Sequence, residues 1–133
     1  MKTFTLVPAE KCGELDFFAD RKIVRKSFGK HREFLKSKSS ENSTDDFGFC
    51  HAYYNVADQL IAIEFFPEAK LYYNEQELFT LTAAGLIKLL KTKDAVTTAD
   101  DYAVLSKKLG IGAEIDAGEI KSILVCTADY FMS

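Results

Sequence analysis

Two aromatic and β-branched runs around a short polar connection constrain the fold of this chain most. Residues 47–66 read FGFCHAYYN, then VAD, then QLIAIEFF. Such runs, joined by a connection that bears Asn55 and Asp58, are typical of a β-hairpin. Apolar residues occupy both alternating positions of each run, which predicts a central pair of strands covered on two sides.

The rest of the chain supplies further strands and two helices. Strands are predicted at residues 3–7, 69–73, 102–105, 109–112 and 123–127. Asp20 and Thr82 are suitable N-caps for helices at residues 21–28 and 83–91. We expect Ile23, Val24, Ser27 and Phe28 to form the buried face of the first helix, which leaves Arg21, Lys22, Arg25 and Lys26 mainly toward solvent. Leu86, Ile87, Leu89 and Leu90 are expected to be buried in the second helix.

This arrangement predicts one α+β domain over residues 1–133, built on a mainly antiparallel β-sheet with about two α-helices. A chain of 133 residues with 47% apolar residues has enough material for one packed core. The polar stretch near residues 36–46 is expected to be an exposed loop. The N-terminus lacks the apolar run of a signal peptide, and no segment approaches the roughly 20 apolar residues of a membrane span. We therefore expect a cytoplasmic protein without a membrane partner.

Charge is unevenly distributed along the chain. Residues 21–38 hold eight Lys and Arg against one Glu, a net charge of +7, although the whole chain carries −3. Residues 39–133 hold seven Lys and Arg against fifteen Asp and Glu, a net charge of −8. Such asymmetry predicts a charged recognition surface, although an ordinary solvated helix face and loop would also explain it.

No motif in the sequence indicates catalysis, a metal centre or a cofactor. Cys50 and His51 are consecutive in a predicted strand, so their side chains should point to opposite faces and cannot form a local catalytic pair. Cys12, Cys50 and Cys126 are expected to be buried thiols. The carboxylate pairs Asp45–Asp46 and Asp100–Asp101 are interpreted as solvated loop or cap residues. Glu64 stands alone in an apolar run, and a pocket around Glu64 or His51 remains an open alternative.

The order of elements resembles that of a known group of proteins. The segment GELDFFADRKIVRKSFGK is similar to the Gly-x-x-x-Phe-Gly-Met, helix, Leu-Gly opening of small bacterial α+β proteins with a PsbP-like arrangement. The pieces YYN, IEFF, LYYN, LF, LIKLL and SILV follow in a comparable order, and Phe18–Ala19 stand where the pattern has Gly-Met. The resemblance implies an immunity protein of a polymorphic toxin system, with a toxin domain as partner.

Two functions from different classes follow. The first is a non-catalytic immunity protein that occludes the active or substrate-binding surface of a cognate toxin. Its expected interface is acidic: Asp94, Asp100, Asp101, Glu114, Asp116 and Glu119. The alternative is a nucleic-acid-associated module that uses the basic segment 21–38 to neutralise phosphates. Its expected site is Arg21, Lys22, Arg25, Lys26, Lys30 and Arg32.

Overall fold

The predicted hairpin is present in the computed structural model, which describes residues 3–38 and 40–131. It joins β6 (Cys50–Tyr54) and β7 (Leu60–Phe65). The side-chain oxygen of Asn55 accepts from two backbone N–H groups of the connecting turn. β6 begins three residues later than its apolar run, because Phe47 N–H donates to the Cys50 carbonyl and Gly48 has a φ of 88°. Residues 47–49 thus lie in a turn before the strand.

The hairpin lies inside an eight-stranded antiparallel sheet of order β10-β11-β12-β13-β7-β6-β5-β4. Its other strands are β10 (Thr98–Ala99), β11 (Ala103–Ser106), β12 (Ile111–Asp116), β13 (Glu119–Cys126), β5 (Thr44–Asp46) and β4 (Arg32–Phe34). A second sheet has the order β3-β2-β1-β8-β9. Its strands are β3 (Leu15–Asp16), β2 (Lys11–Cys12), β1 (Thr3–Val7), β8 (Lys70–Tyr73) and β9 (Gln76–Glu77), and only β1 and β8 pair in parallel. The predicted α+β class and mainly antiparallel pairing are confirmed.

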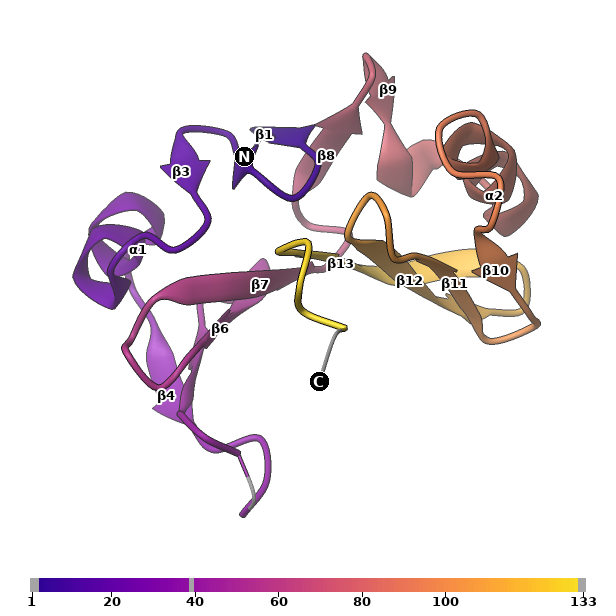
Figure 1. The fold of residues 1–133 in the computed structure, drawn as a ribbon. Coiled ribbons are helices and arrows are strands. Elements are labelled where there is room, and N and C mark those ends of the chain that lie inside the picture. The colour runs from indigo at the N-terminus through magenta and orange to yellow at the C-terminus, as the bar shows by residue number, and fades with distance from the viewer. Residues whose placement is uncertain (1–2, 39, 132–133) are drawn as a thin grey trace.

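Both helices and the smaller sheet lie on one side of the eight-stranded sheet, whereas the C-terminal segment crosses the other side (Figure 1). The helices are α1 (Arg21–Phe28) and α2 (Ala83–Lys91), and a short 3₁₀ helix spans Leu78–Thr80. One hydrophobic core joins these layers. Phe4 of β1, for example, contacts the rings of Phe28 and Phe65 at centroid distances of 5.5 and 5.1 Å. The core therefore fixes the sheets and helices as one α+β unit.

The cap residues of both helices are confirmed, but the buried face of α1 is not the predicted one. Asp20 accepts from Lys22 N–H, and Thr82 accepts from Gly85 N–H. In α1 the buried stripe is Arg21, Val24 and Phe28, whereas Ile23 is 56% exposed. Arg21 therefore takes the place of Ile23 and Ser27 on the buried face, because its guanidinium lies beside the buried carboxylate of Asp45. In α2 Leu86 and Leu90 are fully buried, and Ile87 and Leu89 are partly buried.

The polar stretch before the hairpin is only partly an exposed loop. Lys36, Lys38 and Glu41 are exposed, and Ser39 lies outside the described residues. Residues 44–46, however, form β5 between β4 and β6. The prediction missed this strand because TDD has low strand propensity, and pairing on both sides overrides that preference.

The backbone approaches itself closely where β12 begins beside the end of β13. Gly110 precedes β12 with a φ of 66°, and a Cβ at this position would collide with the carbonyl oxygen of Cys126. Cys126 N–H also donates to the Gly110 carbonyl at 2.9 Å. Glycine is therefore required here both by conformation and by space.

Candidate functional site

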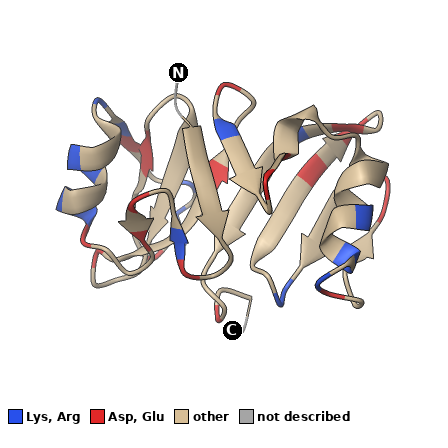
Figure 2. Ribbon diagram, turned by 90° about the horizontal axis from the view of Figure 1, so that it is seen from above, with Lys and Arg blue, Asp and Glu red and all other residues tan. Residues whose placement is uncertain are grey.

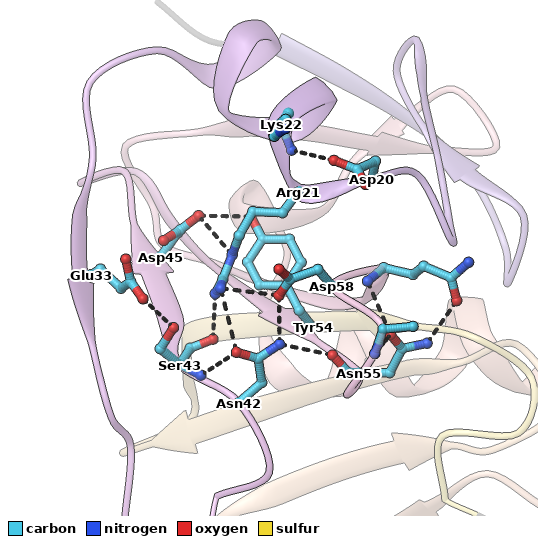
Figure 3. Close-up of polar contacts among 12 residues, drawn as sticks. Asp20, Arg21, Lys22, Glu33, Asn42, Ser43, Asp45, Tyr54, Asn55 and Asp58 are labelled. Atoms are coloured by element: carbon cyan, nitrogen blue, oxygen red, sulfur yellow. Dashed lines mark hydrogen bonds and ion pairs between the residues drawn. The ribbon is translucent and has the colours of Figure 1, made fainter.

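Arg21 of the predicted basic set turns inward. It is 8% exposed, and its guanidinium donates to the side chains of Asn42 and Asp58 and, at 2.6 Å, to the carbonyl oxygen of Ser43. The guanidinium also lies 4.0 Å from the ring centroid of Tyr54 (Figure 3). The prediction that Arg21 faces solvent is therefore wrong. Its charge holds α1 on the sheet and does not reach a partner.

Asp45 is the buried carboxylate beneath Arg21. Arg25 donates two hydrogen bonds to it at 2.7 and 2.8 Å, Tyr54 donates one at 2.9 Å, and Arg21 Nε lies 3.5 Å away. Burial alone would raise the pKa of Asp45, but these hydrogen bonds and the two arginine charges outweigh burial and lower the pKa. The interpretation of Asp45 as a solvated residue is wrong. It is an anion that fastens α1 to β5 and β6.

The outward part of the basic set is smaller than the sequence suggests. Arg25 is shared between Asp45 and Glu33, which accepts at 3.0 Å. Arg32 is 84% exposed on its side chain and lies 3.8 Å from Asp46. The exposed lysines of the set are Lys22, Lys26 and Lys30. Lys and Arg residues also occur on α2 (Figure 2). Positive charge is therefore less concentrated in the folded protein than it is along the sequence.

Asp94 of the predicted acidic set is not on the surface. It is 3% exposed, and Ser106 Oγ donates to its Oδ2 at 2.7 Å while Val96 N–H donates to its Oδ1 at 3.1 Å. The hydrogen bond from Ser106, followed by that from Val96, lowers the pKa of Asp94 against the effect of burial. Asp94 therefore fixes the turn after α2 to β11, and its assignment to a binding surface is corrected.

The other five acidic residues are exposed at one end of the eight-stranded sheet: Asp100, Asp101, Glu114, Asp116 and Glu119. They lie where β11 begins, β12 ends and β13 begins. Asp100 is also structural, because its Oδ1 accepts from the N–H groups of Tyr102 and Ala103. Tyr102, which was not among the predicted site residues, is 77% exposed and directly follows Asp100 and Asp101. Its neighbouring aspartates were the available signal.

Glu64 lies on the face of the eight-stranded sheet that is turned away from the helices. Tyr53 Oη donates to its Oε1, and Ser122 Oγ donates to its Oε2, both at 2.9 Å. It lines a hollow of about 290 Å³ together with residues of β11, β12 and β13. A hollow is therefore present at Glu64, and its lining residues do not include His51. The isolated acidic residue in an apolar strand was its sequence signal.

His51 and the cysteines have structural environments. His51 packs between the rings of Phe34 and Phe66, at centroid distances of 5.3 and 4.9 Å. All three cysteines are buried, and burial raises the pKa of Cys12 and of Cys126 to about 12. Among residues 3–38 and 40–131, no group of three His, Cys, Asp or Glu side chains is placed to hold a metal ion.

No protein-family model, curated protein or solved structure matches this chain. In the part of the chain that the structure describes, neither helix is long and apolar enough to cross a bilayer.

Proposed function

We propose that this protein is a cytoplasmic immunity protein, which binds a cognate toxin domain and covers its active or substrate-binding surface. The observation that carries the proposal is the exposed side chain of Tyr102 beside Asp100, Asp101 and Glu114. A tyrosine that is 77% exposed leaves much of its ring in water in the free protein. Tyrosines of this kind are frequent anchors of protein interfaces, where the ring is buried and the hydroxyl keeps a polar partner.

The register of the sheet places these residues together. Ala103 of β11 pairs with Glu114 of β12, and Ile115 N–H donates to the Tyr102 carbonyl at 2.8 Å. The proposed interface is therefore an aromatic anchor with exposed carboxylates around it. Acidic groups of this kind complement a basic surface, such as that of a toxin that binds nucleic acid, and they accelerate association with it.

The alternative function is a nucleic-acid-associated module on the basic segment. Its support is the exposure of Lys22, Lys26, Lys30 and Arg32. Arg21 and Arg25 are paired with Asp45, which leaves fewer charges for phosphates than the sequence suggested. Such a module would bind with an affinity that falls steeply as the salt concentration rises.

An affinity pull-down tests the proposal directly. The tagged protein is exposed to lysate of its source cells after nuclease treatment, washed at low and high salt, and the retained proteins are identified by mass spectrometry. A toxin domain retained in stoichiometric amount supports the proposal. Retention of nucleic acid without nuclease, and its loss in salt, would instead support the alternative. If neither a toxin nor nucleic acid is retained, the proposed function is contradicted.

Matched variants connect the result to the proposed surface. Tyr102→Ala should weaken the toxin complex by about 2 kcal/mol, roughly 30-fold, because the anchor is lost. A triple change of Lys22, Lys26 and Lys30 to Gln is the control, and it should leave toxin binding unchanged. Equal affinities of the wild type and Tyr102→Ala would remove this surface from the interface.

A further inference from the structure

The hollow beside Glu64 exists because one position in a row of paired residues has no side chain. Leu105, Gly112, Leu124 and Glu64 are successive cross-strand partners on β11, β12, β13 and β7. Directly paired residues point to the same face of a sheet. Gly112 therefore leaves a gap between two leucines, and Glu64 closes one end of it. The gap belongs to a hollow of about 290 Å³.

The hollow has apolar walls and two carboxylates. Leu105 and Leu124 are apolar walls, and Tyr102 and Phe131 also line the hollow. Glu114 adds a second carboxylate, because it pairs with Ser122, the residue that donates to Glu64. Among the described residues, the only partners found for the Glu64 carboxylate are hydroxyl groups, and no Lys or Arg forms an ion pair with Glu64 or Glu114.

These features select one class of occupant. An anion would be repelled by the two carboxylates, and a purely apolar group would remove water from Glu64 without replacing it. A cationic side chain with an apolar stem satisfies both parts, since the stem packs on the leucines and the charge meets Glu64. A guanidinium also stacks on aromatic rings, which favours arginine over lysine where Tyr102 and Phe131 lie.

We propose that this hollow is a receptor for an arginine side chain of the partner protein. The identity of that partner rests on the proposed function, but the preference of the hollow does not. The Tyr53 and Ser122 hydroxyls hold the Glu64 carboxylate in place from the sheet side. Each of its oxygens can still accept another hydrogen bond from a guanidinium that enters from solvent.

A titration with small probes tests the hollow without the partner. The probes are N-acetyl-arginine amide and its neutral isostere N-acetyl-citrulline amide, with N-acetyl-lysine amide as a third. The measurement is the NMR shift of the Leu105 and Leu124 methyl groups. We expect saturable shifts with the arginine probe, with a dissociation constant on the order of millimolar for one side chain. Binding of the citrulline probe should be at least about tenfold weaker.

Three variants separate the contributions. Glu64→Gln keeps the shape of the side chain and should weaken arginine binding about tenfold. Gly112→Val fills the hollow and should abolish binding. A Cβ at Gly112 would meet Leu105 Cδ1 at 3.5 Å, the Val104 carbonyl oxygen at 3.6 Å and Leu124 Cβ at 4.0 Å, which are ordinary van der Waals contacts. The control is Glu119→Gln, because Glu119 is exposed, pairs with Lys121 and lies outside the hollow.

Each outcome decides the proposal. Equal binding of the arginine and citrulline probes, shifts that do not saturate, or unchanged binding in Glu64→Gln would overturn it. Equal binding of the lysine probe would overturn the assignment to arginine. A positive titration together with an empty pull-down would support the hollow and contradict the immunity function. A toxin complex together with a negative titration would support that function and overturn the hollow.

Discussion

The two helices lie on the same side of the same sheet, but different forces attach them. Both helices bury apolar side chains, Val24 and Phe28 in α1 and Leu86 and Leu90 in α2. α1 is in addition fastened by Arg21 and Arg25 to the buried Asp45. Each helix has a side-chain N-cap and basic residues in its last turn. The difference is therefore in the attachment and not in the local helix signals. The same kinds of N-cap and C-terminal residues thus occur in two helices that contact the sheet in different ways.

The difference predicts unlike sensitivities in the two regions. An ionic attachment is specific in geometry and strongly destabilised when one partner is removed, because a buried charge remains without its counterion. An apolar attachment depends on volume and is insensitive to pH. The α1 region should therefore respond to charge and pH, and the α2 region to cavity formation.

The largest expected effect is that of Asp45→Asn. The substitution removes the counterion of two arginines and turns an amide N–H toward one of their donors, so we expect a loss of about 4 kcal/mol in the free energy of unfolding. Urea unfolding at neutral pH measures it. The matched control is Asp46→Asn. Asp46 lies on the opposite face of β5, and its side chain is 23% exposed. This variant should lose less than about 1 kcal/mol in the free energy of unfolding. Similar losses for both variants would contradict an ionic attachment of α1.

Leu90→Ala should lower the free energy of unfolding by about 3 kcal/mol, because Leu90 is fully buried and truncation leaves a cavity. The loss should be the same at pH 7 and pH 5. Lys88→Ala on the exposed side of the same helix is the control and should change stability by less than about 0.5 kcal/mol. A loss that depends on pH would show that charges also attach α2.

Asp94→Asn should cost about 1–2 kcal/mol, less than Asp45→Asn although both carboxylates are buried. The reason is that Asp94 accepts from a hydroxyl and a backbone N–H, so no buried cation loses its partner. The comparison is made by urea unfolding of the two variants under one set of conditions. A loss for Asp94→Asn equal to that for Asp45→Asn would mean that burial, rather than ion pairing, determines the cost.

The smallest effect concerns the slope of stability against pH. The pKa of Asp45 is lowered in the folded protein. The ionised carboxylate therefore contributes its full stabilisation at pH values above the pKa of an unfolded aspartate, about 3.9, and this stabilisation is lost as the pH falls through the folded pKa. One such group contributes at most about 1.4 kcal/mol per pH unit. Unfolding midpoints between pH 7 and pH 3 should therefore fall less steeply for Asp45→Asn than for the wild type. Parallel curves would exclude Asp45 as a source of acid sensitivity.

Much of the fold followed from local patterns. The hairpin around Asn55 and Asp58 was predictable because apolar periodicity and turn chemistry agree there. The caps Asp20 and Thr82 were predictable because they act on the adjacent N–H groups. The predicted site was less successful, since Arg21 and Asp94 are charged residues that usually lie outside, and only their distant partners bring them inside.

The sequence by itself determined the central hairpin, the helix starts and the uneven charge, because these depend on neighbours along the chain. Only the tertiary structure decided that Asp45 lies under Arg21, that Tyr102 stands among exposed acidic residues, and that Gly112 leaves a gap beside Glu64. In each case the deciding contacts join strands or helices that are far apart in sequence. A side chain's burial and charge environment depend on those contacts, and local periodicity carries no record of them.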